Sequence, residues 1–365
     1  MHSDELKYLM ALSYVPKLGA KRIRDLMQHF GTAANIWNLT QKEKNAIQGL
    51  NKAVSNGIGK EEYLELVDSE LNFCNAHQVS VSSLYDDDYP YLLQQCIDAP
   101  LILFQRGNMN LKDGKFIAIV GTRKMTSRGK DFIKELIGGF HNQPVSIVSG
   151  LAFGVDAQAH LSSIENNLQT IGVLAHGVNQ IFPKTNASIG YKMMNNGGIL
   201  SEFSTFHAPE PENFLRRNRI IAGLCEATIV VESGLAGGAM STARHANNYN
   251  RDVFAVPGRP TDHSAKGCHH LIKNHQAFLL TEAEDVLKFL NISQKKKKNI
   301  QKELFVELSE PEQKLYDLLK RKGKLHIDFL ALELGMAGYQ LMPVLLDLEL
   351  KNLIEPLPGK YFDLA

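Results

Sequence analysis

Cysteine is scarce in this chain of 365 residues, and no two of its four cysteines form a CxxC pair. The four are far apart in the sequence, at Cys74, Cys96, Cys225 and Cys268. This spacing argues against a disulfide framework and against a zinc site built from cysteines. It suits a protein of a reducing compartment.

Long apolar runs are also absent, since no stretch approaches the ~20 residues that a transmembrane helix needs. The N-terminal segment MHSDELKYLM carries acids where a secretory signal peptide needs a basic start and an apolar stretch. We therefore expect a cytoplasmic protein with no membrane partner.

A strong net charge is the third absence, because the formal charge is only +1. Any binding of nucleic acid must then come from a local basic patch and not from the field of the whole molecule. Hydrophobic residues make up 44% and charged residues 22% of the chain, the balance of an ordinary globular protein. Its length predicts two or three domains.

The apolar pattern divides the chain into a helical part and a sheet part. Residues 1–84 have apolar side chains at helical spacing, with VPKLGA and HFGTA as turns. Residues 85–290 instead contain short β-branched runs that alternate with helical stretches, which predicts an α/β fold with a parallel sheet. These runs are FIAIV, VSIVS, QTIGVL, GGILSE, ATIVVES and DVFAVPG.

A polar segment follows at residues 291–304, with four consecutive lysines from Lys295 to Lys298. It predicts a solvated basic linker, and an arm that touches DNA is the alternative. In residues 305–365, Ser309 and Glu312 have the spacing of a capping box ahead of the first of three helical patterns. A hairpin with Pro358 and Gly359 at its tip completes the pattern of a winged helix.

Ligands of doubly wound sheets bind beyond the carboxyl ends of the strands, and those positions are glycine-rich here. The loop SGLAGGAMST is the clearest example: Ser233, Gly234, Gly237 and Gly238 allow close approach of backbone amides, and Ser241 and Thr242 follow at a helix start. A helix start of this kind binds anions. Tight turns between strand and helix are the structural alternative for each single loop.

Known nucleotide motifs do not explain this loop. No GxGxxG follows the first strand and no GxxxxGK[ST] occurs, so hydride transfer and nucleoside triphosphate hydrolysis both lose support.

Three arginines within four residues form the second candidate feature, in the segment FLRRNRII. Arginine pairs with phosphate oxygens in bidentate fashion and stacks on bases. Arg123 and Lys184, each close after a predicted strand, would add positive charge at the same edge. Ion pairs of Arg216 or Arg219 with acids such as Glu202 or Glu232 are the structural alternative.

Catalytic and metal-binding groups are weakly indicated. Asp156 and His160 share a helix face by their spacing, and we expect Asp156 to cap or pin a loop, with catalysis as the alternative. The stretch from His263 to His275 is rich in histidine but matches no standard ligand spacing. We therefore expect no metal and no cofactor, although the sequence leaves a metal in this stretch open.

These motifs resemble, in order, those of the DNA-processing protein A family, also called DprA or Smf. The resemblance covers about residues 85–282, through AIVGTRKMTSRG, SGLAFGVDAQAH, FPKTN, GGILSE, FLRRNRIIAGL, SGLAGGAMSTA and VFAVPG. It implies an extended Rossmann-like domain that forms a homodimer, binds single-stranded DNA and hands it to the recombinase RecA in natural transformation. It also implies an N-terminal SAM-like or helix-hairpin-helix domain and a C-terminal winged helix of the DML1 type.

The positions that match the family's DNA pocket are Arg123, Lys184, Arg217 and Arg219. With the neighbouring loop residues, the predicted DNA-binding set is Gly121, Thr122, Arg123, Lys184, Asn186, Arg216, Arg217, Asn218, Arg219, Ser233, Gly234, Gly237, Gly238, Ser241 and Thr242. The recognition helix expected in the winged helix, Tyr339 to Leu350, has no Lys or Arg and carries Asp347 and Glu349. Its charge is unsuited to the major groove, so we expect protein contact or packing there.

The rival hypothesis is an enzyme that acts on nucleotides, such as a phosphoribohydrolase of the lysine-decarboxylase-like group. That group has a similar glycine-rich loop but pairs it with a glutamate. Here Ala243 and Arg244 follow Thr242, so the expected acid is missing.

Overall fold

The computed structural model describes residues 3–292, 308–351 and 353–364. It contains two compact units, Met1–Gln294 and Lys295–Ala365. The predicted basic linker falls almost entirely outside the described residues.

The first unit begins with a group of helices, as the apolar spacing predicts. Leu9, Leu12, Ile23 and Ile36 are fully buried in it. The loop VPKLGA joins the first two helices, and Lys17 within it has a φ of 65°, a conformation that glycine adopts more readily. The helices are α1 (Ser3–Tyr14), α2 (Ala20–Phe30), α3 (Ala33–Trp37), α4 (Gln41–Ala46), α5 (Lys52–Gly57) and α6 (Glu61–Ala76).

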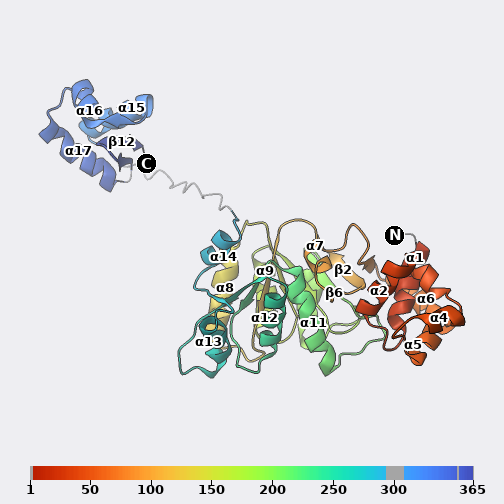
Figure 1. The fold of residues 1–365 in the computed structure, drawn as a ribbon. Helices are drawn as coiled ribbons and strands as arrows, with labels where there is room; N and C mark the ends of the chain where they lie inside the picture. Colours follow the sequence, from red (N-terminus) through yellow and green to blue (C-terminus); the bar gives the residue numbers. More distant parts are fainter. Residues whose placement is uncertain (1–2, 293–307, 352, 365) are drawn as a thin grey trace. The chain divides into compact units, whose positions relative to one another are not determined.

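The rest of this unit is built around a nine-stranded sheet (Figure 1). Its strands lie in the order β1-β2-β6-β5-β4-β3-β7-β8-β9. All six predicted runs are strands, and they pair in parallel. They are β3 (Lys115–Val120), β4 (Val145–Ser149), β5 (Gln169–Val173), β6 (Gly197–Ser201), β7 (Ala227–Val230) and β8 (Asp252–Ala255). The predicted Rossmann-like parallel sheet is confirmed.

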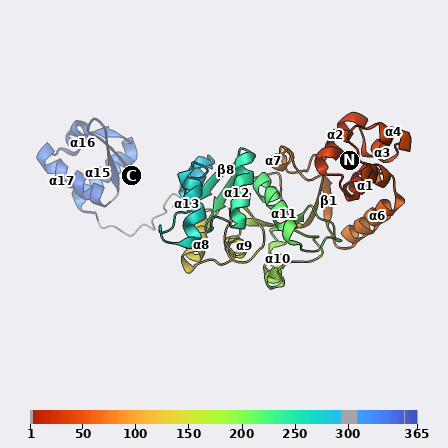
Figure 2. The ribbon, with the colours of Figure 1, turned by 60° about the horizontal axis from the view of Figure 1, so that its bottom comes forward.

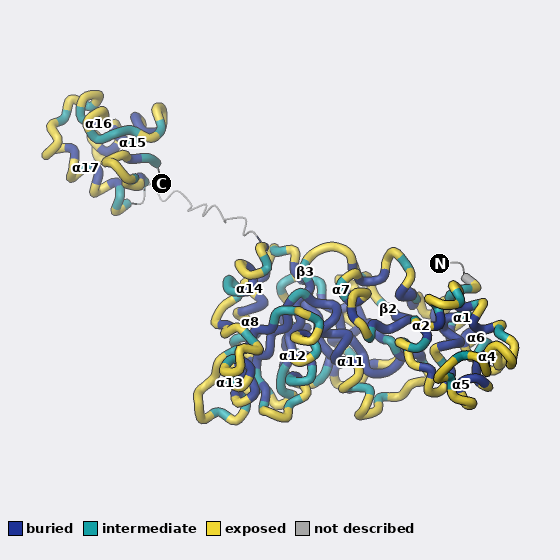
Figure 3. The backbone as a smooth tube through the Cα atoms, in the orientation of Figure 1, coloured by how far each residue is buried: buried dark blue, intermediate teal, exposed yellow. Residues whose placement is uncertain are grey.

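Helices cover both faces of this sheet because successive strand residues point to opposite sides. Ala118 and Val120 of β3 pack in one core with α11 (Pro211–Leu224) and α12 (Gly238–Asn248), whereas Ile117 and Ile119 pack in the other with α8 (Ser127–Gly139). Figure 2 shows the layers from a second direction, and Figure 3 shows the buried strands between them. The helices are α7 (Tyr91–Gln94), α8 (Ser127–Gly139), α9 (Val155–Glu165), α10 (Ala187–Met193), α11 (Pro211–Leu224), α12 (Gly238–Asn248), α13 (Lys266–Lys273) and α14 (Ala283–Phe289), with 3₁₀ turns η1 (Lys184–Asn186) and η2 (His263–Ala265).

Three further strands extend the sheet beyond the predicted ones. The strands β1 (Ser80–Ser83) and β2 (Ile102–Asn108) add antiparallel pairs at one edge, and β9 (Phe278–Leu279) adds a parallel pair at the other. Because β1 precedes residue 84, the large sheet begins inside the segment that we expected to be only helical. The division of the chain at residue 84 stays a prediction.

The second unit has the elements of a winged helix. The helices are α15 (Glu310–Lys322), α16 (Ile327–Leu334) and α17 (Gly338–Leu350), and the strands are β10 (Leu325–His326), β11 (Ile354–Leu357) and β12 (Tyr361–Leu364). The predicted capping box is present, and the backbone amide of Ser309 donates to Glu312 Oε2 at 2.7 Å. Strands β11 and β12 form the predicted hairpin.

No single helix in the described ranges is long and apolar enough to cross a membrane. Helices α16 and α17 meet that length and composition only as a pair, which is bent by 108°.

Candidate functional site

A pocket of about 320 Å³ lies at the carboxyl edge of the sheet. The chain runs from β3 through β4 and β5 to β6 and then returns to the other side of β3 as β7, so the order of strands reverses between β3 and β7. The loops after these two strands line the pocket, as expected at such a reversal. Ten residues of the predicted DNA-binding set contribute: Gly121, Thr122, Arg123, Arg217, Asn218, Ser233, Gly234, Gly237, Gly238 and Thr242.

The loop after β3 supplies an exposed cation. Arg123 is exposed, its guanidinium lies 5.6 Å from the centre of the Phe214 ring, and it forms no ion pair within the described ranges. A backbone hydrogen bond fixes this loop to the segment after β7: the amide of Thr122 donates to the carbonyl oxygen of Glu232 at 2.7 Å. The glycine at 121 meets a packing need: a Cβ there would lie 2.5 Å from Val155.

The loop after β7 supplies backbone amides. Helix α12 starts at Gly238, and its N-cap residue Gly237 offers no side chain to cap the helix. The amides of Gly238 and Ala239 take part in no hydrogen bond that the structure shows among its described residues. A Cβ on Gly237 would lie 2.4 Å from Ser233 Oγ, whereas a Cβ on Gly238 would meet nothing within 4 Å.

The helix start therefore presents free donors and positive dipole charge at the pocket. Protein packing explains the glycine at 237. It does not explain the glycine at 238, where the space above the backbone is open to a ligand.

Arg217 also lines the pocket but is held from within the protein. Its side chain donates to the carbonyl oxygen of Gly150 at 2.8 Å and to that of Val173, and the residue is 4% exposed. Asp156 lies nearby and accepts hydrogen bonds from the amides of Gly150 and Ala152. Arg217 is thus a buried positive charge in the pocket wall.

Burial dominates the ionisation of these two groups. Desolvation raises the pKa of Asp156 in spite of the neighbouring Arg217, and desolvation lowers the pKa of Arg217 to about 10 in spite of Asp156. Each charge makes the other less costly to bury.

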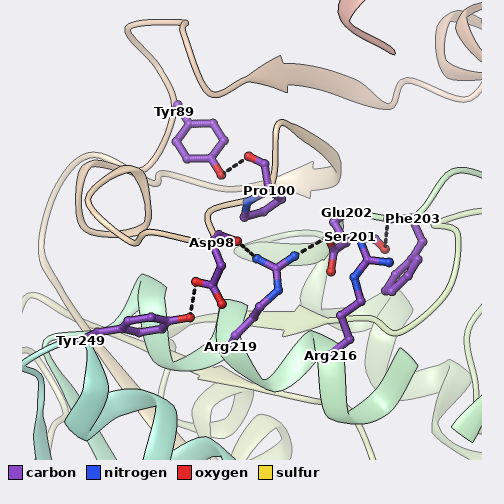
Figure 4. A network of polar contacts seen from close by, with 9 residues as sticks. All are labelled: Tyr89, Asp98, Pro100, Ser201, Glu202, Phe203, Arg216, Arg219 and Tyr249. Atoms are coloured by element: carbon purple, nitrogen blue, oxygen red, sulfur yellow. Dashed lines mark hydrogen bonds and ion pairs between the residues drawn. The ribbon is translucent and has the colours of Figure 1, made fainter. Parts of the chain in front are cut away.

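Arg216 and Arg219 do not line this pocket. Both pair with Glu202, with distances to Oε2 of 3.1 Å for Arg216 and 2.5 Å for Arg219 (Figure 4). Arg219 also donates to the carbonyl oxygen of Asp98. The structural alternative noted for these arginines is therefore the arrangement present.

Helix geometry explains why the arginines separate. Successive helix residues are turned by about 100°, so Arg217 faces the sheet edge together with Asn218, whereas Arg216 and Arg219, three residues apart, share the side that faces Glu202. A direct phosphate contact by Arg219, as predicted from the sequence, would require this ion pair to break.

Lys184 and Asn186 lie in η1, outside the residues that line the pocket. Lys184 is exposed. Asn186 is buried, and its side chain donates to the carbonyl oxygens of Leu151 and Ala152 at 2.9 and 3.1 Å. Asn186 thus orders the loop after β4. Ser241, in α12 next to the lining residue Thr242, does not itself line the pocket.

Asp156 and His160 each have hydrogen-bond partners in neighbouring segments. Asp156 pins the loop after β4, as expected, and His160 lies within hydrogen-bonding distance of Thr170 Oγ1, at 2.7 Å. The Thr170 hydroxyl also lies 3.1 Å from the carbonyl oxygen of Ile147, which accepts from it. The structure shows no hydrogen bond between the Asp156 and His160 side chains.

The side chains of Cys268 and His269, in the histidine-rich stretch, contact different parts of the backbone. Cys268 is fully buried with its Sγ 3.5 Å from the carbonyl oxygen of Val230, while the His269 ring contacts the backbone of Gly258. Over the described ranges, no three His, Cys, Asp or Glu residues are grouped so as to hold a metal ion.

The sequence reasoning did not single out Phe214 and Leu215, which line the pocket. Their place next to the arginines in FLRRNRII was the only available signal. Phe182, which is not a lining residue, lies 6.1 Å from the Phe214 ring with nearly half of its surface exposed.

Family models and related proteins point to the same family for this chain. Residues 80–291 match the family model described as DNA recombination-mediator protein A, and residues 306–360 match the one described as the DprA winged helix domain. Protein Smf of Synechocystis is 34% identical over 290 residues, which cover 77% of this chain and 72% of that protein. DNA processing protein DprA of Streptococcus pneumoniae is 38% identical over 227 residues, or 62% of this chain and 79% of that protein.

Solved structures of proteins from the same family resemble this one. The crystal structure of DprA from Streptococcus pneumoniae has a TM-score of 0.67 at 33% identity and covers 77% of this chain and 97% of its own. DNA processing protein A of Helicobacter pylori, whose structure was described for its single-stranded DNA binding mode, has a TM-score of 0.53 at 28% identity and covers 59% of this chain and 96% of its own.

Proposed function

Because the chain belongs to the DNA recombination-mediator protein A family, we propose that it binds single-stranded DNA at the carboxyl edge of its sheet. In this role it protects incoming DNA and loads RecA during natural transformation. The proposal gives the protein no catalytic step and no cofactor, and it places the protein in the cytoplasm. Its four cysteines are unpaired and buried, which suits a reducing compartment.

The observation that carries the proposal is the uncapped start of α12 beside the exposed Arg123. Free amides and a guanidinium at one pocket form a site for phosphate oxygens, since both are donors with positive charge. The relative from Helicobacter pylori, which has a single-stranded DNA binding mode, supports the choice of ligand.

The proposed mechanism is capture of the DNA backbone. Arg123 and the α12 amides take adjacent phosphates at the pocket, and Lys184 takes a phosphate further along the strand. Arg217 contributes its buried charge from within the pocket wall, where its side chain is already hydrogen-bonded to the carbonyl oxygens of Gly150 and Val173. The exposed rings of Phe182 and Phe153 are available for base stacking, which is worth ~1 to 3 kcal/mol per base.

Bases that do not stack remain open to pairing or to a recombinase filament. This accessibility is what a protein that delivers DNA to RecA requires.

A salt titration tests the proposal. With three or four phosphates contacted on a single strand, log K against log salt should fall with a slope of roughly −2 to −3. A duplex of matching sequence should bind more weakly than the single strand. Equal affinity for duplex and single strand would contradict the proposal.

The rival enzymatic function is tested separately. Incubation with nucleoside monophosphates, followed by analysis for released base, should show no turnover. Any turnover that depends on the pocket would overturn the non-catalytic assignment.

We further propose that the protein forms a homodimer through the sheet edge at β9. Phe278, Leu279 and Phe289 are 51%, 52% and 41% exposed, and the rings of Phe278 and Phe289 lie 4.9 Å apart. An exposed edge strand with an apolar patch favours association. Leu279→Arg should convert the dimer to a monomer in analytical ultracentrifugation, and an unchanged dimer would exclude this edge.

A further inference from the structure

Glu232 lies just after the end of β7 and directly before Ser233, which lines the pocket. Glu232 itself is not a lining residue, and the acid that pairs with the arginines of α11 is Glu202. The contacts of Glu232 run instead to the neighbouring loop, the one that follows β3. Glu232 therefore joins two of the loops that line the pocket.

Glu232 holds both ends of the loop after β3. At the near end, its carbonyl oxygen accepts from the amide of Thr122 at 2.7 Å. At the far end, its carboxylate accepts from the amide of Thr126 at 3.0 Å and from the Thr126 hydroxyl at 2.5 Å. The exposed Arg123, which lines the pocket, lies between these two anchor points.

The far anchor has the form of a helix cap that is completed from outside the helix. Thr126 is the N-cap of α8, and its hydroxyl accepts from the amide of Gly129 at 3.1 Å. In a capping box, the third residue of the helix supplies a Glu or Gln side chain to the N-cap amide. The third residue of α8 is Gly129, which has no side chain, and Glu232 supplies the carboxylate in its place.

The glycine at 129 makes room for this carboxylate. A Cβ at that position would lie 2.8 Å from both Cδ and Oε1 of Glu232, closer than a Cβ atom normally approaches. The positive end of the α8 dipole also favours a negative charge there. Thr126 and Glu232 thus fit together although they are 106 residues apart in the sequence.

The position of Arg123 depends on this loop. No ion pair fixes the Arg123 guanidinium within the described ranges, and the centre of the Phe214 ring lies 5.6 Å from it. Its direction is therefore set mainly by the backbone of its own loop. A donor that is already held in its binding position loses less conformational freedom on binding, so it binds more tightly.

We propose that Glu232 is a positioning residue of the pocket. It fixes the loop of Arg123 to the loop that leads into α12, so that the guanidinium and the α12 amides meet adjacent phosphates at a constant separation. The inference rests on the proposed function, since it gives Glu232 a part in phosphate binding. Glu232 acts through its hydrogen bonds, because a negative charge near a phosphate would by itself repel the ligand.

Glu226 provides a matched control at the other end of the same two strands. It directly precedes β7, and its Oε2 accepts from the amide of Phe116 in β3 at 2.8 Å. Like Glu232, it links the chain at β7 to the backbone at β3 through a carboxylate. It lies at the amino ends of these parallel strands, whereas the pocket lies at their carboxyl ends.

The first experiment titrates an oligonucleotide of thymidine with each variant by fluorescence anisotropy at several salt concentrations, and urea unfolding checks that each variant is folded. Glu232→Ala should bind about fivefold more weakly than the wild type, with a slope of log K against log salt less steep by up to about 0.7. Glu226→Ala should keep the affinity and the slope. An equal loss in both variants would reflect general loosening of the strands and would overturn the inference.

Glu232→Gln tests whether the hydrogen bonds or the charge matter. It should bind within about twofold of the wild type, because an amide can keep both contacts: its oxygen accepts from the Thr126 amide, and its nitrogen donates to the Thr126 hydroxyl oxygen. A loss as large as that in Glu232→Ala would assign the effect to the charge and contradict the inference.

A double-mutant cycle tests whether Glu232 acts through Arg123. Once Arg123→Ala has removed the guanidinium, adding Glu232→Ala should weaken binding by less than about twofold further. If Glu232→Ala costs as much affinity in this background as in the wild type, Glu232 does not position Arg123 and the inference is wrong.

Gly129→Ala disturbs the same contact from the side of α8. The added Cβ displaces the Glu232 carboxylate, so this variant should lose about as much affinity as Glu232→Ala, and the two changes together should lose no more than either alone. Gly138→Ala, in the same helix, adds a Cβ that meets nothing within 4 Å and should leave binding unchanged. Losses from Gly129→Ala and Glu232→Ala that add up would show that the two residues act independently, against the inference.

The outcomes separate the inference from the proposed function. Binding of the single strand that Arg123→Ala weakens but Glu232→Ala does not would overturn the inference alone. If the wild type shows no preference for the single strand over a duplex, the proposed function is overturned, and the inference with it.

Discussion

Arg219 and Glu202 form an ion pair in which Nη2 lies 2.5 Å from Oε2 and the two side chains are only 10% and 5% exposed. Arg216 shares the same carboxylate oxygen at 3.1 Å, yet most of its side chain is in solvent. One acid thus holds two arginines of a single motif in very different environments. The environments decide what each arginine contributes.

The first prediction concerns folding stability. Arg219→Ala should lower the free energy of unfolding by about 3 kcal/mol or more, because it leaves the buried Glu202 carboxylate without its main partner. Arg216→Ala should cost ~0 to 1 kcal/mol, as exposed ion pairs do. Urea unfolding of both variants measures the difference, and equal costs would show that burial of the pair does not matter.

The second prediction separates binding from stability at Gly238. Gly238→Ala should leave the fold as stable as before or slightly more stable, because the added Cβ meets nothing in the protein and alanine favours helix. The same Cβ should obstruct a phosphate at the α12 amides and weaken binding of single-stranded DNA about tenfold.

Gly138→Ala is the control for Gly238→Ala. Gly138 lies in α8, where a Cβ would also meet nothing within 4 Å, but it lies outside the pocket lining. Anisotropy titrations with both variants should show a loss only for Gly238→Ala. A loss in both, or in neither, would remove the helix start from the site.

The third prediction concerns the salt dependence of binding. Arg123→Ala should weaken binding to all sequences alike and make the slope of log K against log salt less steep by about 0.7, one phosphate contact on a single strand. Lys130→Ala, an exposed cation on α8 away from the pocket, should change neither. An unchanged slope in Arg123→Ala would exclude a phosphate contact there.

The fourth prediction is a dependence of stability on pH. Burial, with a smaller effect of Arg217, lowers the pKa of His160 from 6.5 to about 3, so the unfolded chain takes up the proton more readily than the folded one. The stabilisation is complete above pH 6.5 and is lost as the pH falls towards 3. From pH 7 to pH 5 the loss from this group is about 2 kcal/mol.

His160→Gln isolates this contribution, because an amide can keep the hydrogen bond to Thr170 but does not titrate. The variant should lose less stability than the wild type between pH 7 and pH 5 in urea unfolding. Parallel losses in the two proteins would mean that His160 titrates normally in the folded state.

The fifth prediction concerns the C-terminal part. Helix α17 presents Tyr339 and Leu350, which are 79% and 72% exposed, and no basic residue, so the winged helix should add little to DNA affinity. A chain that ends at residue 308 should bind single-stranded DNA within about twofold of the whole protein.

A chain that ends at residue 294 also loses Lys295 to Lys298. If these lysines form only a solvated linker, the two truncated chains should have equal salt slopes. A less steep slope in the shorter chain would favour the DNA-touching arm.

The strands and most of the pocket could be predicted from the sequence because local pattern carried the information. The β-branched runs predicted six of the seven strands that pair in parallel, and the glycines after them indicated the edge of the sheet where the pocket lies. The strands β1 and β2 were missed because β2 pairs with β6, a segment distant in the sequence, and β1 joins the sheet only through β2. Nothing local in Ser80–Ser83 announces a strand.

The partners of the individual arginines could not be predicted, for a different reason. Arg217 and Arg219 have the same chemistry, and only the surroundings of α11 assign one to the carbonyl oxygens of Gly150 and Val173 and the other to Glu202. The acceptor Asp98, which precedes β2, lies 121 residues from Arg219 and had no signal of its own.

Gly150 illustrates a wider consequence of this packing. A Cβ at this position would lie within 2.4 to 2.6 Å of the Arg217 guanidinium. The absence of a side chain at 150 is therefore a demand of the arginine and not of any ligand. Positions 150 and 217 should change together in evolution, and a search for DNA-binding glycines by sequence would count this one wrongly.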